Sequence, residues 1–164
     1  MVMGLFGNRD RREKKDVELG PDLFKRIDIL LSTHWQDEDS TGIAYFTSEK
    51  SEKQPLEVVG ESYCQDEIKS NFKPEEWVYG LLVPEQSNKA DPNAVAIYLI
   101  TKDYGVSRVG YLKKEMAKKV SQKIANLMVN EGKVIPVLAI VKFGPDKDSN
   151  WGIRAYAMTD AIKF

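Results

Sequence analysis

The sequence has little of the chemistry on which most enzymes and metalloproteins depend. Its 164 residues include one cysteine and one histidine. A single cysteine excludes an internal disulfide, and one residue of each kind excludes a zinc finger. There is no glycine-rich phosphate loop of the dinucleotide or P-loop type, and no nucleophile elbow. The sequence therefore predicts a protein without catalytic activity, metal or cofactor.

The few reactive side chains have simple structural interpretations. His34 lies in an acidic polar loop without a second ligand, which favours an ordinary surface histidine. The run "DEDS", residues 37–40, lacks the spaced ligands and the glycine of a calcium loop, so solvated charges are the better interpretation. Cys64 follows Tyr63 in a strand-like run, and we expect it to be a small packed side chain.

Long apolar runs and an excess of one charge are also missing. No run approaches the ~20 apolar residues of a membrane span. The start, "MVMGLFGNRDRREKK", places apolar residues before charges, the reverse of a secretory signal, and Val2 follows Met1 where myristoylation needs glycine. We expect a soluble intracellular protein. Because 24 Lys and Arg oppose 25 Asp and Glu, any nucleic-acid site must be a local basic patch.

The residue pattern divides the chain into an N-terminal extension, residues 1–54, and a compact domain, residues 55–164. The first 16 or so residues are charged and predicted to be disordered. Residues 21–31, "PDLFKRIDILL", predict a short amphipathic helix that begins at Pro21. A polar loop, a strand over residues 43–47 and a linker follow. The apolar stripe of that helix comprises Leu23, Phe24, Ile27, Leu30 and Leu31.

The compact domain is predicted to be mainly β, because runs rich in β-branched and aromatic residues alternate with turn signals. Gly60 within the first run suggests a bulge or a close backbone approach, and "NAVAIYLI" is typical of a strand buried on both faces. Five or six short strands with one helix predict a small OB-like or SH3-like β-barrel, partly open, or a sandwich. The predicted strands span residues 56–64, 75–84, 93–100, 107–112, 134–143 and 150–157.

Residues 113–132 predict the helix of this domain. Its apolar side chains form one stripe, and Gly132 stands where helices commonly end. The stripe comprises Met116, Val120, Ile124, Leu127 and Met128, and the lysines of the helix region are Lys113, Lys114, Lys118, Lys119 and Lys123.

Three aromatic residues lie near these basic residues in the predicted order of elements. Tyr63 ends the first strand, Tyr111 precedes the helix and Trp151 begins the last strand. Single-stranded nucleic acid needs such a combination, because bases stack on rings for roughly 1–3 kcal/mol each while cations hold the phosphates. The alternative interpretation is structural, since barrel aromatics are commonly core residues and helix lysines commonly form a solvated face.

Three segments, taken in order, resemble the HIRAN domain family. They are "VVGESY" at 58–63, "NKADPNAVAI" at 88–97 and "RVGYLKKEMAKKV" at 108–120. The resemblance covers about residues 55–158 and leaves the N-terminal third uncovered. It implies an OB-like barrel that binds the 3′ end of single-stranded DNA, without catalytic activity, in DNA repair or replication-fork processing. DNA binding would place a bacterial protein in the cytoplasm near the nucleoid, and a eukaryotic one in the nucleus.

The resemblance also implies roles for single residues. Tyr63 matches the aromatic that stacks on the terminal base, and Asp91 matches the aspartate that accepts a hydrogen bond from the 3′-hydroxyl. Lys114 matches a phosphate-contacting lysine, and Trp151 is the nearest match to an aromatic that walls the pocket. The predicted DNA-binding set is completed by Asn93, Tyr111 and Lys113.

Two positions depart from the family pattern. Ser62 stands where the animal family member has an arginine, and Ala90 where it has an aromatic residue. These changes remove one cation and one ring from the predicted pocket. They leave open an alternative function, a protein-interaction module that keeps the fold without the DNA site. In that case the extension, through its helix at 21–31, would bind a partner protein or pair with a second copy.

Asp91 likewise has two interpretations. Pro92 biases it toward an extended backbone, and its carboxylate could satisfy backbone N–H groups of its own turn. Alternatively it accepts a hydrogen bond from a sugar hydroxyl. An ionised aspartate only accepts hydrogen bonds, so it suits a hydroxyl and repels a phosphate.

Overall fold

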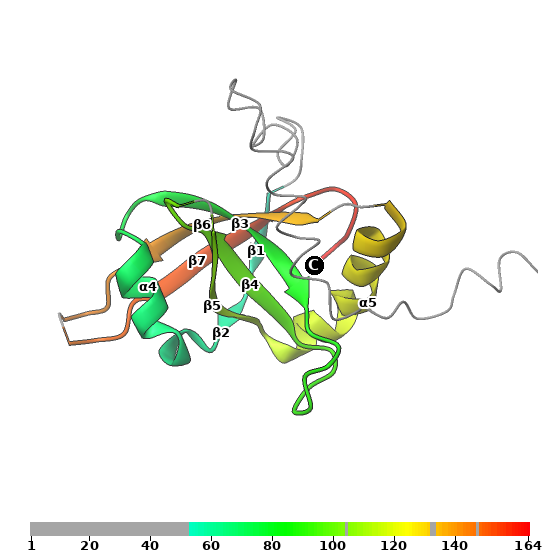
Figure 1. Ribbon diagram of the computed structural model, residues 1–164, viewed down its shortest axis with the longest axis horizontal. Helices are drawn as coiled ribbons and strands as arrows, with labels where there is room; N and C mark the ends of the chain where they lie inside the picture. Colours follow the sequence, from blue (N-terminus) through cyan, green and yellow to red (C-terminus); the bar gives the residue numbers. More distant parts are fainter. Residues whose placement is uncertain (1–52, 104, 132–133, 147) are drawn as a thin grey trace, which may run out of the picture.

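A computed structural model of the chain describes residues 53–103, 105–131, 134–146 and 148–164 (Figure 1). The predicted fold class is confirmed: the described part is mainly β, with a nearly closed, OB-like barrel and two α-helices. Several predictions lie outside the described residues. They are the helix at 21–31, the strand at 43–47, the surface role of His34, the acidic run 37–40 and the helix stop at Gly132.

The sheet nearly closes because its two edge strands are consecutive in the chain. β1 (Lys53–Leu56) pairs with β7 (Gly152–Met158), and β2 (Val58–Val59) pairs with β5 (Val106–Leu112). Only Glu57 separates the two edge strands. The strand order is β1-β7-β6-β3-β4-β5-β2 with every pair antiparallel, so the first segment of the domain bridges the opening of the barrel.

The remaining strands carry the core. They are β3 (Trp77–Pro84), β4 (Val95–Ile100) and β6 (Ile135–Lys142). The prediction that "NAVAIYLI" is buried on both faces is confirmed, since Val95, Ala96 and Ile97 are all fully buried. Within the described residues there are seven strands instead of five or six, because a separate strand, β1, precedes the part of the first predicted strand that forms β2.

The prediction of a strand through Tyr63 and Cys64 is wrong. Gly60 adopts a left-handed backbone with φ 81°, which turns the chain out of β2. A 3-10 helix η1 (Glu61–Tyr63) and the helix α4 (Gln65–Asn71) follow. Ile68 lies within α4 and Phe72 directly follows its last residue. These two side chains, four residues apart, are both buried. Cys64, which joins η1 to α4, is only 2% exposed. Its predicted role as a packed side chain is therefore confirmed.

The long helix α5 (Lys114–Glu131) forms as its apolar stripe predicted. Val120 and Ile124 are fully buried and Met128 nearly so, whereas its lysines are exposed. Figure 1 shows α4 and α5 at opposite ends of the barrel. The two helices therefore cover the ends of the core, and the strand faces between them form the sides.

Candidate nucleic-acid interface

Tyr63 projects from a short, well-anchored turn. Its side chain is 90% exposed although its backbone N–H donates to Gly60 O at 3.1 Å. The next residue, Cys64, is buried, and its N–H donates to Glu61 O at 2.9 Å. These hydrogen bonds and the buried Cys64 side chain fix the turn to the barrel, while the Tyr63 ring faces solvent. An exposed ring on a fixed backbone can stack on a flat ligand without first leaving the core.

Tyr111, in contrast, is held by its own hydroxyl. The hydroxyl donates to the Glu85 carboxylate, at 2.8 Å to Oε1, and accepts a hydrogen bond of 2.8 Å from Arg108 Nη1. Its ring also lies against Gly60, because a Cβ built there would be 3.5 Å from Tyr111 Cδ2. Tyr111 therefore connects β5 to the base of the β3–β4 loop and to the turn that carries Tyr63.

This network makes a testable prediction about pH. Burial, together with the hydrogen bond to Glu85, raises the pKa of Tyr111 to about 12. In the unfolded chain the hydroxyl ionises near its usual value of about 10, so the unfolded state loses a proton first as pH rises. We expect the free energy of unfolding to fall between pH 10 and 12, and to fall less in Tyr111→Phe. Urea unfolding at pH 9 and pH 11 measures this, and equal losses in both proteins would contradict it.

The loop between β3 and β4 contains Asp91 and closes on itself. Glu85 N–H donates to Ala94 O at 2.8 Å, and Asp91 Oδ1 accepts from Asn93 N–H at 2.9 Å. The Asx-type turn that the sequence allowed for Asp91 is therefore present. It uses one carboxylate oxygen, and Oδ2 has no hydrogen-bond partner among the described residues. Asn88 supports the turn by accepting from the N–H groups of Ala90 and Asp91 through Oδ1.

The same loop lies beside the first turns of α5 at the lower edge of Figure 1. Asn93 Oδ1 accepts from Ser121 Oγ at 3.4 Å, which joins the loop to the helix. Lys113 N–H donates to Glu57 O at 2.8 Å, and its ammonium forms an exposed ion pair with Glu57 Oε2 at 3.0 Å. The hydrogen bond to Glu57 raises the pKa of Lys113. Lys114 is exposed and forms no ion pair with any described residue.

Trp151 lies beside α4, where the Gln65 side chain fixes its backbone. Gln65 Oε1 accepts from Trp151 N–H at 2.8 Å, and Gln65 Nε2 donates to Trp151 O at 2.9 Å. Because Gln65 is two residues from Tyr63, these bonds join the final hairpin to the turn that carries Tyr63.

Sequence reasoning missed two side chains that accompany Trp151. Phe143 packs its ring edge-on to Trp151 at 5.3 Å and is 62% exposed, while the Lys69 ammonium lies 5.7 Å above the Trp151 ring. Phe143 could have been found as an aromatic residue at the end of a strand just before a polar turn. Lys69 could not, because no helix was predicted between residues 64 and 75, where α4 lies.

These contacts place the predicted residues in two connected groups. Tyr63 and Trp151 flank α4, while Asp91, Asn93, Lys113 and Lys114 lie on the β3–β4 loop and the start of α5. Tyr111 lies between the groups through its contacts with Gly60 and Glu85. The roles of these seven residues in binding stay predictions.

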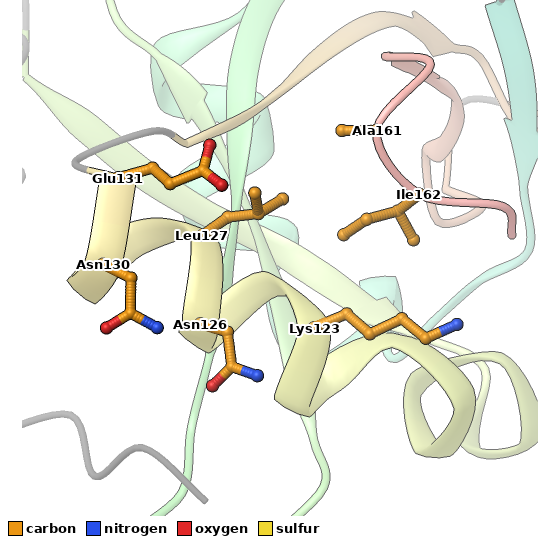
Figure 2. A pocket seen from close by; sticks show the side chains of 7 residues that line it. All are labelled: Lys123, Asn126, Leu127, Asn130, Glu131, Ala161 and Ile162. Carbon is orange, nitrogen blue, oxygen red and sulfur yellow. The ribbon is translucent and has the colours of Figure 1, made fainter. Parts of the chain in front are cut away.

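A separate hollow of about 270 Å³ lies between α5 and the C-terminal segment (Figure 2). It is away from the predicted residues and shares none of them. Its lining comprises Lys123, Asn126, Leu127, Asn130, Glu131, Ala161 and Ile162.

The described residues form a small barrel-shaped binding domain. Exposed aromatic rings and cations are fixed on short turns at its edge, and within residues 53–164, apart from the few undescribed ones, no group of three or more His, Cys, Asp and Glu could hold a metal ion. No helix in the described part is long and apolar enough to cross a membrane. The model of the HIRAN domain family matches residues 51–157. The chain therefore belongs to the HIRAN family, whose domains are known as DNA-binding modules.

Two solved structures are similar to this chain. A protein from Lactobacillus plantarum is 22% identical, with 66% of this chain and 98% of that chain covered, at a TM-score of 0.38. The HIRAN domain of human HLTF is 23% identical, with 65% of this chain and 74% of that chain covered, at a TM-score of 0.40. No curated protein matches the chain.

Proposed function

We propose that this protein binds single-stranded DNA at its 3′ end and acts in DNA repair or replication-fork processing without catalysing a reaction. The observation that carries the proposal is the 90% exposed ring of Tyr63 on a turn that hydrogen bonds and a buried neighbour hold in place. A base that stacks on this ring meets a surface with its orientation already set, so little conformational entropy is lost on binding.

The carboxylate of Asp91 provides the discrimination in this proposal. Its Oδ1 maintains the turn, and Oδ2 is left to accept a hydrogen bond from a terminal hydroxyl. A phosphate in the same place would bring two negative charges together with no hydrogen to share. Lys114, exposed and without an ion pair in the described structure, would hold the preceding phosphate. Asp91 and Lys114 together favour a strand end over a continuing strand.

The two departures from the family pattern have neighbours that can compensate for them. Ser62 supplies no cation, but Lys69, on the following helix α4, places its ammonium above the Trp151 ring. Ala90 supplies no ring, but Phe143 and Trp151 form an aromatic pair at the base of the loop that joins β6 and β7. We therefore include Phe143 and Lys69 in the proposed binding surface, where they would contact a second base and its phosphate.

The role of Asp91 can be tested with two oligonucleotides that differ only at the 3′ terminus. The wild-type chain should bind a 3′-hydroxyl strand more tightly than the matching 3′-phosphate strand, as measured by fluorescence anisotropy. In Asp91→Asn this preference should shrink by roughly tenfold or more, which corresponds to one charge-assisted hydrogen bond of about 1.5–3 kcal/mol. The amide keeps an oxygen for the Asn93 N–H, so the turn should survive. Wild-type protein with equal affinity for both ends would remove the assigned role.

A protein-interaction module stays the second candidate. The outward face of β3, β6 and β7 favours it, because that face presents large apolar side chains such as Trp77, which is 50% exposed. A chain that binds no oligonucleotide at low salt, but is retained by a protein partner, would support this function instead. In either case we propose a division into a folded domain over residues 55–164, which β1 extends back to Lys53, and an N-terminal extension before it.

A further inference from the structure

The side of the barrel formed by β3, β6 and β7 is apolar on its outer as well as its inner surface. Tyr79 lies directly opposite Leu138, and Leu138 directly opposite Tyr156, so these three share one face of the sheet. Trp77, two residues before Tyr79, and Met158, two residues after Tyr156, lie on the same face. We call this set, Trp77, Tyr79, Leu138, Tyr156 and Met158, the outer aromatic face.

This face is partly exposed to solvent in the described structure, which is unusual for its composition. Trp77 is half exposed, and the other four members are only partly buried. The residues that point the other way, such as Val137, Ala139 and Ala157, are fully buried in the barrel. β6 reads "IPVLAIV" without a polar residue before Lys142. A strand with so continuous an apolar run is typical of sheets that are covered on both faces, and only one face is covered by the described residues.

The chain itself enters the domain beside this face. Lys53 is the first described residue, and it pairs with Met158 at the start of β1. Its ammonium lies 4.2 Å from the centroid of the Tyr156 ring and 5.0 Å from that of Trp77. The two rings are 6.2 Å apart and tilted by 42°, so the cation contacts both. Lys53, where the extension joins the barrel, therefore lies at the edge of the outer aromatic face.

The extension contains a segment of matching size and polarity. Leu23, Phe24 and Ile27, with two leucines further on, form one apolar stripe of the predicted helix 21–31. Eleven helical residues are about 16 Å long, and the distance from β1 across to β3 is three strand spacings, or about 14 Å. The 21 residues from Ser32 to Glu52 can span up to about 70 Å, so the segment reaches the whole face.

We propose that the amphipathic segment 21–31 packs its apolar stripe on the outer aromatic face of its own chain. The hollow beside α5 is another candidate receptor in the described structure, and Lys123, Asn126 and Asn130 give it a polar rim (Figure 2). Burial of an apolar stripe in such a hollow would lower the free energy little, whereas burial against a surface of large apolar side chains would lower it much more. The outer aromatic face is distinct from the residues proposed for DNA binding, so this inference does not depend on them.

Two matched substitutions in the full-length chain test the proposal. Ile27 lies at the centre of the apolar stripe, and Ile29 lies on the opposite side of the same predicted helix. Ile27→Asp and Ile29→Asp introduce the same charge and lose the same side chain. The readout is the fluorine resonance of Trp77 in protein labelled with 5-fluorotryptophan, assigned with Trp77→Phe, and its broadening by a soluble paramagnetic probe.

We expect Trp77 to shift and its accessibility to the probe to rise severalfold in Ile27→Asp, whereas Ile29→Asp matches the wild-type protein. The Trp151 resonance, which reports on the α4 end of the barrel, should stay unchanged in both variants. A Trp77 that is equally accessible in all three proteins overturns the proposal. So does protection of Trp77 that disappears on dilution while the sedimentation coefficient falls, because a second copy would then cover the face.

Discussion

Gly80→Ala is expected to destabilise the barrel by about 3 kcal/mol or more, which would be among the largest effects of any single substitution in this chain. Gly80 is buried in β3, opposite Leu99 of β4. A Cβ at this position would meet the carbonyl oxygen of Tyr98, and it would lie 3.0 Å from Leu99 Cα and 2.7 Å from Leu99 Cδ2. Two of these atoms belong to the backbone of the neighbouring strand, so no change of side-chain rotamer relieves the contact.

Gly152→Ala provides the matched control. Gly152 also lies in a strand, β7, but a Cβ there would have nothing within 4 Å. Its replacement should change the free energy of unfolding by no more than about 0.5 kcal/mol, as for an open surface position. Urea unfolding followed by far-ultraviolet circular dichroism measures both variants. Equal midpoints for the two would show that the β3–β4 contact does not require glycine.

Tyr63→Ala is expected to weaken binding of a single-stranded 3′-hydroxyl oligonucleotide by roughly 5- to 150-fold, the equivalent of about 1–3 kcal/mol for one stacked base. The ring is almost fully exposed, so its loss removes no core packing and should leave the unfolding midpoint unchanged. An effect on affinity without an effect on stability distinguishes a binding role from a structural one. Anisotropy titrations at a single low salt concentration measure the loss.

Two further variants define what the Tyr63 result means. Tyr63→Phe retains the ring and should keep most of the affinity, because stacking uses the face of the ring and not the hydroxyl. Trp77→Ala removes an exposed ring from the outer aromatic face and should leave DNA affinity as in the wild type. If Tyr63→Ala binds as well as the unchanged protein, the aromatic ring at this turn is not part of the DNA site.

Several elements were predictable because their side chains repeat with the period of the element. β4 has the continuous apolar run of a strand buried on both faces, and α5 has apolar residues three and four apart. Both formed as predicted, with Ile97 and Ile124 fully buried. The segment after Gly60 was misread, because "ESYC" looks like the end of a strand when only nearest neighbours are considered. Ile68 and Phe72 carry the helical signal, and their burial depends on the rest of the barrel.

The candidate site, too, contains residues that the sequence predicted and residues that only the fold brings together. Tyr63, Asp91 and Lys114 could be named from the sequence, because the motifs that contain them lie in short stretches of chain. Lys69 could not be placed beside Trp151, since it lies on a helix 82 positions away from that residue in the sequence. Tyr111 was predicted as a binding residue, and only the fold brings Glu85 to its hydroxyl across 26 positions.

The sequence by itself determined the family, the periodic strands and the long helix of this protein, because motif spacing and apolar period are properties of local stretches of chain. Tertiary structure decided how β1 and β2 nearly close the barrel, why Tyr63 faces solvent while Cys64 is buried, and which face of β6 points away from the barrel core. Those outcomes depend on contacts between residues far apart in the chain. Such contacts arise only when the whole core packs, so no local pattern contains them.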